Sequence, residues 1–183
     1  MYSEDRLCES GWTRFVRTIG PVCIKVFTVD KPIIFDQAKS FCELEGALLG
    51  GIENEQEHTF VRDEAAVQNA VISNYRNGVW LAGVRLDSCR GSDWASKPGC
   101  REQSFKWTDP YVTGINGFYF YPERPDGVMI SGVQQNCLVM YTTINEIAYH
   151  GLMDDHFCDA YCPDVDVQCG INMISYICVK TAG

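Results

Sequence analysis

The 183-residue sequence lacks any apolar run long enough to cross a bilayer, and the polar residues 1–5 are unlike a signal peptide. It also lacks basic character: its net charge of −9 argues against nucleic acid and anionic membranes as partners. No phosphate-binding loop, GxSxG or HExxH motif occurs, and no nucleophile–base–orienter set is visible. The sequence therefore predicts neither an enzyme nor direct membrane insertion.

Ten cysteines are present, and none of them forms a CxxC pair. An even number of cysteines spread over the chain is typical of disulfides formed in an oxidising compartment, which predicts a secreted or cell-surface ectodomain. The alternative is a reduced protein with zinc sites, but Cys158, Cys162 and Cys169 are spaced unlike the usual zinc ligands. We expect residues 8–183 to form a single domain and residues 1–7 to be a disordered or artificially added N-terminus.

Hydrophobic periodicity predicts helices early and most strands late, which is an α+β pattern. Helices are expected over Ile34–Glu45 and from Asn54 to Ala70, where Asn54 and Glu57 match a capping box. Strands are expected over residues 11–16, 23–27, 47–52, 79–84, 105–108, 137–141, 149–153 and 174–179.

The segment 109–136 is rich in Gly, Pro, Tyr and Phe and has no regular pattern, so we expect a long functional loop. At least one of its aromatic side chains should be exposed, because tyrosine is often only partly buried. Those side chains are Tyr111, Phe118, Tyr119, Phe120 and Tyr121. His58, on the second helix, is expected at the surface or in the capping turn.

Several ordered motifs resemble the C-type lectin-like domain. The run Trp80–Gly83 is similar to the WIGL motif of that family, and Phe105–Asp109 is similar to its F-x-W-x-D motif before the long loop. Gly11-Trp12 with Cys23 resembles the long form of the family, which carries an N-terminal hairpin. The resemblance extends from Cys8 to Val179. It implies an α+β fold with two helices packed on small antiparallel sheets and a long irregular loop region.

The resemblance also implies a disulfide pattern. The family pairs correspond to Cys8–Cys23, Cys42–Cys178 and Cys137–Cys158. Pairing the remaining cysteines locally gives Cys89–Cys100 and Cys162–Cys169, for five disulfides in all.

In sugar-binding members of the family, a calcium ion in the long loop coordinates two sugar hydroxyls. The ligand positions correspond here to Arg124 before Pro125 and Asp126, to Gln135, and to Asp154-Asp155. Asp126, Gln135, Asp154 and Asp155 offer oxygens that suit calcium. Arg124 has no acceptor atom. Either Arg124 replaces the ion by pairing with the carboxylates, or Glu123 moves into its place and calcium remains the cofactor.

The resemblance implies a recognition domain that binds a glycan or an extracellular protein through its long-loop face. The residues expected on that face are Tyr119, Tyr121, Glu123, Arg124, Asp126, Gln135, Asp154 and Asp155. The alternative is a calcium-independent protein-binding member, or a structural one acting in a matrix, a coat or ice binding. The identity of the ligand and the oligomeric state stay open.

Overall fold

The computed structural model describes residues 7–73, 76–143, 145–159 and 171–183. Its helices are α1 (Phe35–Leu44) and α2 (Glu55–Ala70), with short 3₁₀ helices η1 (Asp87–Cys89) and η2 (Trp94–Ser96). Its strands are β1 (Thr13–Arg17), β2 (Gly20–Thr28), β3 (Leu48–Leu49), β4 (Asn77–Arg85), β5 (Phe105–Trp107), β6 (Met129–Ile130), β7 (Val133–Gln134), β8 (Cys137–Tyr141), β9 (Met153–His156) and β10 (Asn172–Thr181). These elements confirm the α+β class.

One eight-stranded sheet forms the centre of the fold. Its main order is β1-β2-β10-β4-β8-β9, while β3 pairs with β10 and β5 pairs with β4. The pairing of β10 with β4 is parallel and the other pairings are antiparallel. The expected small sheets are thus joined into one, and the hairpin β6–β7 makes a separate two-stranded sheet.

The two helices cover opposite faces of this sheet. Successive strand residues point to opposite faces. In β4, Trp80 and Ala82 belong to the core cluster that includes Phe35 and Cys42 of α1, whereas the alternate residues of β4 pack with Val61 of α2. The helix α2 starts as predicted, because the Asn54 side chain accepts a hydrogen bond from the Glu57 N–H at 3.1 Å.

Four disulfides match the expected pairs. They are Cys8–Cys23, Cys42–Cys178, Cys89–Cys100 and Cys137–Cys158. The predicted pair Cys162–Cys169 lies outside the described residues. Cys42–Cys178 joins α1 to β10 across a sequence separation of 136 residues, and a bridge over such a loop is worth about 5 kcal/mol on the chain-entropy model.

One predicted strand is misplaced. A strand was expected over residues 149–153, but turns occupy residues 147–151 and β9 runs from Met153 to His156. The apolar character of Leu152 and Met153 suggested the earlier start. The polar sequence Asp154-Asp155-His156 is buried in β9, where Asp154 and Asp155 accept hydrogen bonds from Tyr141, from Arg85 and from backbone N–H groups.

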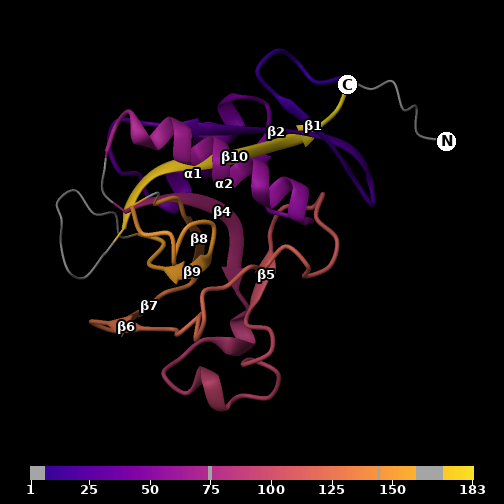
Figure 1. Cartoon of the computed structure of the whole chain (residues 1–183). Coiled ribbons are helices and arrows are strands. Elements are labelled where there is room, and N and C mark those ends of the chain that lie inside the picture. The colour runs from indigo at the N-terminus through magenta and orange to yellow at the C-terminus, as the bar shows by residue number, and fades with distance from the viewer. Residues whose placement is uncertain (1–6, 74–75, 144, 160–170) are drawn as a thin grey trace.

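Figure 1 shows the helices and the long strands at one end of the molecule and the loops between β4 and β5 at the other, while the chain after β5 returns toward the end of α2. The two termini of the described part meet at the helical end of the molecule, where Leu7 and Gly183 exchange two backbone hydrogen bonds of 3.2 and 3.3 Å. Among the described residues, no helix is long and apolar enough to cross a membrane.

A buried ion network fastens the start of the long loop to β1 and α2. Arg17 donates to both carboxylate oxygens of Glu57, at 2.8 and 3.0 Å, and to Asp109 at 2.9 Å. Its remaining contact is the Gly51 carbonyl at 2.9 Å. Asp109 also accepts the backbone N–H groups of Gly51 and Tyr111. We call Arg17, Glu57 and Asp109 the base network.

Candidate functional site

The long loop returns to the sheet as an extended segment, residues 118–121, beside β9. The Tyr121 N–H donates to the Met153 carbonyl at 2.9 Å, and the Met153 N–H donates to the Tyr119 carbonyl at 2.7 Å. Side chains of an extended segment alternate between two sides. Phe118 and Phe120 therefore point one way, and Tyr119 and Tyr121 point the other.

The two tyrosines expected at the binding face, Tyr119 and Tyr121, pack against different neighbours. The Tyr119 ring lies 4.1 Å from the ring of His58 on α2, and the Tyr121 ring stacks 4.7 Å from Tyr149. All five aromatic side chains of the long loop are half-buried, so each is partly exposed and none is fully exposed. The rings of Phe118, Tyr119, Phe120 and Tyr121 each pack against a neighbouring aromatic ring.

His58 lies in the first turn of α2, which is one of the two places expected for it, but it is buried and not at the surface. It is 8% exposed, and its Nε2 lies 2.6 Å from the Gly151 carbonyl. Because a carbonyl only accepts, the Nε2 carries the proton. Burial lowers the pKa of His58 despite this hydrogen bond. The turn at Gly151 packs onto α2 and covers the ring, which sequence periodicity alone does not reveal.

Asp155 lies in β9 and is 1% exposed. One of its oxygens accepts the Asp126 N–H at 3.0 Å, and the other accepts the Gly127 N–H at 2.8 Å and the Arg85 Nη2 at 2.5 Å. Gly127 has a φ of 64°, and a Cβ there would collide with the Trp94 ring, so only glycine brings this N–H to the carboxylate. Asp155 thus ties the long loop to the sheet.

Arg85 is the residue that sequence reasoning missed. It ends β4, is 1% exposed, and lies between the rings of Trp94 and Phe105, with its Cζ 4.8 and 4.9 Å from their centroids. Its Nε donates to the Gln135 carbonyl at 3.0 Å. Burial lowers the pKa of Arg85, although Asp155 opposes this. The available signal was an arginine directly after the buried run Val79–Val84.

Arg124 lies against two of the three carboxylates, as the ion-replacement hypothesis requires. Its Nη1 contacts Asp126, and its Nε lies 3.3 Å from Asp154. The peptide bond between Arg124 and Pro125 is cis. Asp126 also accepts the Val128 N–H at 3.1 Å, so both of its oxygens are engaged.

Asp154 combines a partly shielded carboxylate with a phenol. Tyr141 donates its hydroxyl to Asp154 at 2.8 Å, and the other Asp154 oxygen accepts the Asp155 N–H at 2.9 Å. Burial, and then the neighbouring charge of Asp155, raise the pKa of Asp154 to about 7, although Tyr141 and Arg124 act in the opposite direction. The same burial raises the pKa of Tyr141. We call Arg85, Arg124, Asp126, Asp154 and Asp155 the face network.

The remaining predicted site residues, Gln135 and Glu123, contribute no side-chain contact described for the face network. Gln135 contributes its main chain, which accepts from Arg85 and donates to the Val128 carbonyl at 3.0 Å. Glu123 is exposed and has a φ of 67°. The carboxylates around Arg124 come from Asp126 and Asp154, so Glu123 does not occupy the position that the calcium-retaining hypothesis gave it.

The carboxylates of the face network do not fit a calcium ion as they are arranged. All six oxygens of Asp126, Asp154 and Asp155 already accept hydrogen bonds or contact a guanidinium. Calcium needs six to eight oxygens turned toward it, whereas two arginines already supply positive charge here. Across the described parts of the chain, no group of three or more His, Cys, Asp or Glu is arranged to hold a metal.

A disulfide-braced sheet with two helices and a long loop returning beside β9 is the architecture of C-type lectin-like domains. The calcium-independent type II antifreeze protein shares it over 100% of both chains, with 19% identity and a TM-score of 0.60. The cow CD23 carbohydrate-recognition domain, crystallised with GlcNAc2Man3 oligosaccharide, matches 97% of this chain and 98% of its own, with 19% identity and a TM-score of 0.60. A calcium-dependent type II antifreeze protein matches 95% of this chain and 100% of its own, with 20% identity and a TM-score of 0.56.

The sequence comparison agrees with the structural one. A family model described as C-type lectin domain-containing protein 141/158 matches residues 16–180. The chain belongs to the C-type lectin domain family. No curated protein matches the sequence. The structural neighbours include calcium-dependent and calcium-independent proteins, so the fold leaves the ligand open.

Proposed function

We propose that the domain is a non-enzymatic, calcium-independent extracellular recognition module that binds a protein ligand through its long-loop face. The observation that carries this proposal is the face network itself. Arg85 and Arg124 stand against the three carboxylates that would otherwise attract a cation. The protein supplies its own positive charge at the place where sugar-binding relatives hold the ion.

A protein ligand is favoured by the apolar surface beside the network. The hairpin β6–β7 and the residue before it expose Val128, Met129 and Val133 by 40, 40 and 52%. Met129 pairs with Gln134 and Ile130 pairs with Val133, so Met129 and Val133 project from opposite faces of the hairpin, and a ligand could contact apolar side chains on either face. Arginine and tyrosine, residues enriched at protein interfaces, lie close by as Arg124 and Tyr121.

Titration of the intact domain with calcium chloride tests the proposal. We expect no binding heat and the same melting temperature in calcium chloride and in EDTA. The method is sensitive enough, because calcium at 100 times its dissociation constant would stabilise the fold by about 2.7 kcal/mol. Saturable heat with a melting shift that EDTA reverses would contradict calcium independence.

The variant Asp126→Asn separates the alternatives further. Its half-buried side chain is a calcium ligand in one hypothesis and an ion-pair partner of Arg124 in the other. We expect ligand capture by an extracellular-protein array, scored with and without EDTA, to be unaffected by the chelator in both wild type and variant. Asp87→Asn, which removes an exposed partner of Arg90, is the matched control. A glycan array that becomes positive only with calcium, and is lost in Asp126→Asn, would support the glycan alternative instead.

A further inference from the structure

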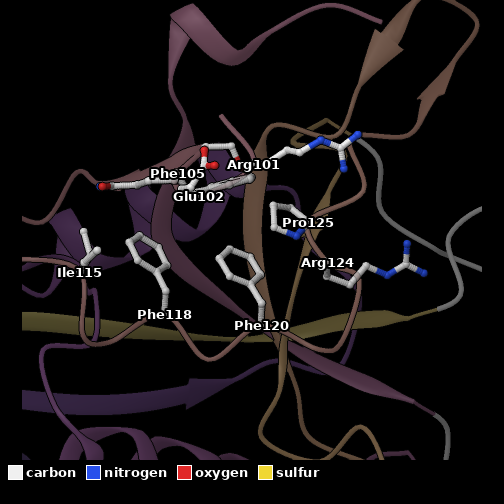
Figure 2. A pocket seen from close by; sticks show the side chains of 10 residues that line it. Arg101, Glu102, Phe105, Ile115, Phe118, Phe120, Arg124 and Pro125 are labelled. Carbon is white, nitrogen blue, oxygen red and sulfur yellow. The ribbon is translucent and has the colours of Figure 1, made fainter. Parts of the chain in front are cut away.

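A cavity of about 240 Å³ opens beside the face network, between residues 101–105 and residues 115–125. Figure 2 shows Phe105, Phe118 and Phe120 with their rings toward it, and Ile115 and Pro125 at its sides. None of these apolar residues takes part in the ion pairs described above. The cavity is therefore a feature separate from the carboxylates.

Three phenylalanine rings, which we call the aromatic floor of the cavity, are held in place by packing against neighbouring rings: Phe105, Phe118 and Phe120. Phe118 stacks on Trp107 with ring centroids 4.2 Å apart, and Phe120 lies parallel to Phe118 at 5.7 Å. Phe105, which is 1% exposed, lies 5.9 Å from Phe120 at the end of this row. A row of mutually packed rings loses little freedom when a ligand covers it, so binding there avoids much of the usual ordering cost.

The size of the cavity limits what it can hold. A dry protein cavity of about 150 Å³ binds benzene, whereas sites for drug-sized ligands run from about 300 to 1,000 Å³. A volume of about 240 Å³ therefore suits one large apolar side chain. Its floor of Phe105, Phe118 and Phe120 is apolar, whereas polar and charged residues make up the other half of the lining: Arg101, Glu102, Gln103, Ser104 and Arg124.

The rim adds a charge preference. In Figure 2 the side chains of Arg101 and Arg124 extend to the side where Pro125 lies. Arg101 is exposed, and its Nε donates to the Ala95 carbonyl at 2.8 Å, which fixes the direction of its stem. Glu102 is the acidic residue of the lining, and Asp126 and Asp154 engage Arg124, so the charge preference of the rim rests on Arg101. An anionic group beside the inserted side chain would be favoured.

We propose that this cavity receives a large apolar side chain of a protein ligand, and that an acidic residue next to it on the ligand pairs with Arg101. The proposal rests on the proposed function, of which it specifies the ligand chemistry. Arg124 contributes a wall of the cavity and a fixed positive charge that is partly neutralised by its own carboxylates. Arg101 is the cation that a ligand can reach without breaking the face network.

The test is an NMR titration of the isotope-labelled intact domain, in EDTA, with blocked tripeptides. Acetyl-Glu-Phe-Glu-amide should shift the resonances of Ile115, Phe118 and Phe120 saturably, with a dissociation constant of roughly millimolar order for so small a ligand. Replacing the central Phe by Ala should weaken binding at least about tenfold, because the buried ring supplies most of the energy. The Lys-Phe-Lys peptide should bind about threefold more weakly than the acidic one, as an exposed charge contact allows.

Two substitutions locate the contacts. Arg101→Ala should weaken the acidic peptide about threefold, whereas Arg90→Ala in the same segment should not, since Arg90 does not line the cavity. Ile115→Ser should weaken both Phe peptides, whereas Val128→Ser should not. Ile115 and Val128 are 49 and 40% exposed, so neither change removes a buried contact.

Equal shifts from the Phe and Ala peptides, tighter binding of the basic peptide, or the absence of shifts at the solubility limit would overturn the cavity proposal. Repeating the titration in calcium chloride separates this proposal from the one it rests on. Peptide binding at these residues only in calcium would retain the cavity and contradict calcium independence. Absence of peptide binding in both buffers, together with no calcium heat, would overturn the cavity alone.

Discussion

The base network and the face network are both ion clusters that join the long loop to the sheet and its helices, but they are built differently. In the base network one arginine meets two carboxylates, and Arg17 and Glu57 have fully buried side chains. In the face network two arginines meet three carboxylates, and Arg124 and Asp126 keep side-chain exposures of 33 and 28%. The base network therefore fastens the loop, while the face network presents part of its charge to solvent.

The two networks also differ in how many of the buried guanidinium nitrogens donate a hydrogen bond. The three nitrogens of Arg17 all donate, to Glu57, to Asp109 and to the Gly51 carbonyl. In Arg85, by contrast, the buried Nη1 has no hydrogen-bond partner within the described part of the chain. An unmade buried hydrogen bond costs stability, so the face network holds its loop at a higher cost than the base network does.

The largest effect is expected from Arg17→Met. Removing the cation leaves Glu57 and Asp109 buried without their partner, which should destabilise the fold by about 4 kcal/mol. Guanidinium denaturation of the disulfide-intact protein measures this change. Lys106→Met, at an exposed position on β5, is the control and should change stability by less than about 0.5 kcal/mol. Equal losses in both variants would show that the base network does not fasten the loop.

A smaller loss is expected from Arg85→Met, about 3 kcal/mol. Asp155 keeps the two backbone N–H donors of Asp126 and Gly127 when the guanidinium is removed, and the unsatisfied Nη1 is removed with it. The same denaturation experiment measures it, and hydrogen exchange at the Gly127 amide reports whether the loop loosens locally. If Arg85→Met costs as much as Arg17→Met, the two networks do not differ in the way their geometry suggests.

Much of the fold was predictable because its signals are local. The cap at Asn54, the buried faces of α1 and α2 and the apolar run of β4 follow from spacing along the chain. The strand β9 was misplaced because its buried residues are charged, and a pattern of hydrophobicity does not reveal burial that depends on distant partners. The burial of His58 was missed for the same reason, because Gly151, which covers its ring, is 93 residues away in the sequence.

The candidate site was predictable only in part. Family positions placed Arg124 beside Asp126 and Asp154, as the structure has it. Arg85 was missed because it lies on β4, 70 residues before Asp155, and only the antiparallel pairing of β4, β8 and β9 brings the two together. The row formed by Phe105, Phe118 and Phe120 depends likewise on which side of an extended segment faces the sheet. Sequence gives the residue types, and topology decides which of them meet.

The smallest of the expected effects concerns pH and belongs to the face network. The pKa of Asp154 is raised to about 7 in the folded protein, from an ordinary value of 3.8. Between these values the folded state binds a proton that the unfolded state does not, so Asp154 contributes stability that is present below pH 4 and is lost as the pH rises through about 7. The Asp154→Asn variant cannot show this loss.

Denaturation curves at several pH values between 4 and 8 measure the difference between the two proteins. We expect wild type to lose on the order of 2 kcal/mol more than Asp154→Asn over this range. The buried His58 and the half-buried His150, whose pKa values are lowered mainly by desolvation, give stability the opposite slope, but they do so in both proteins and cancel in the difference. Tyr141→Phe, which removes a hydroxyl that favours the ionised carboxylate, should steepen the wild-type loss. Parallel pH profiles for wild type and Asp154→Asn would mean that the face network keeps Asp154 ionised throughout, and that it resembles the base network more closely than its exposed edge suggests.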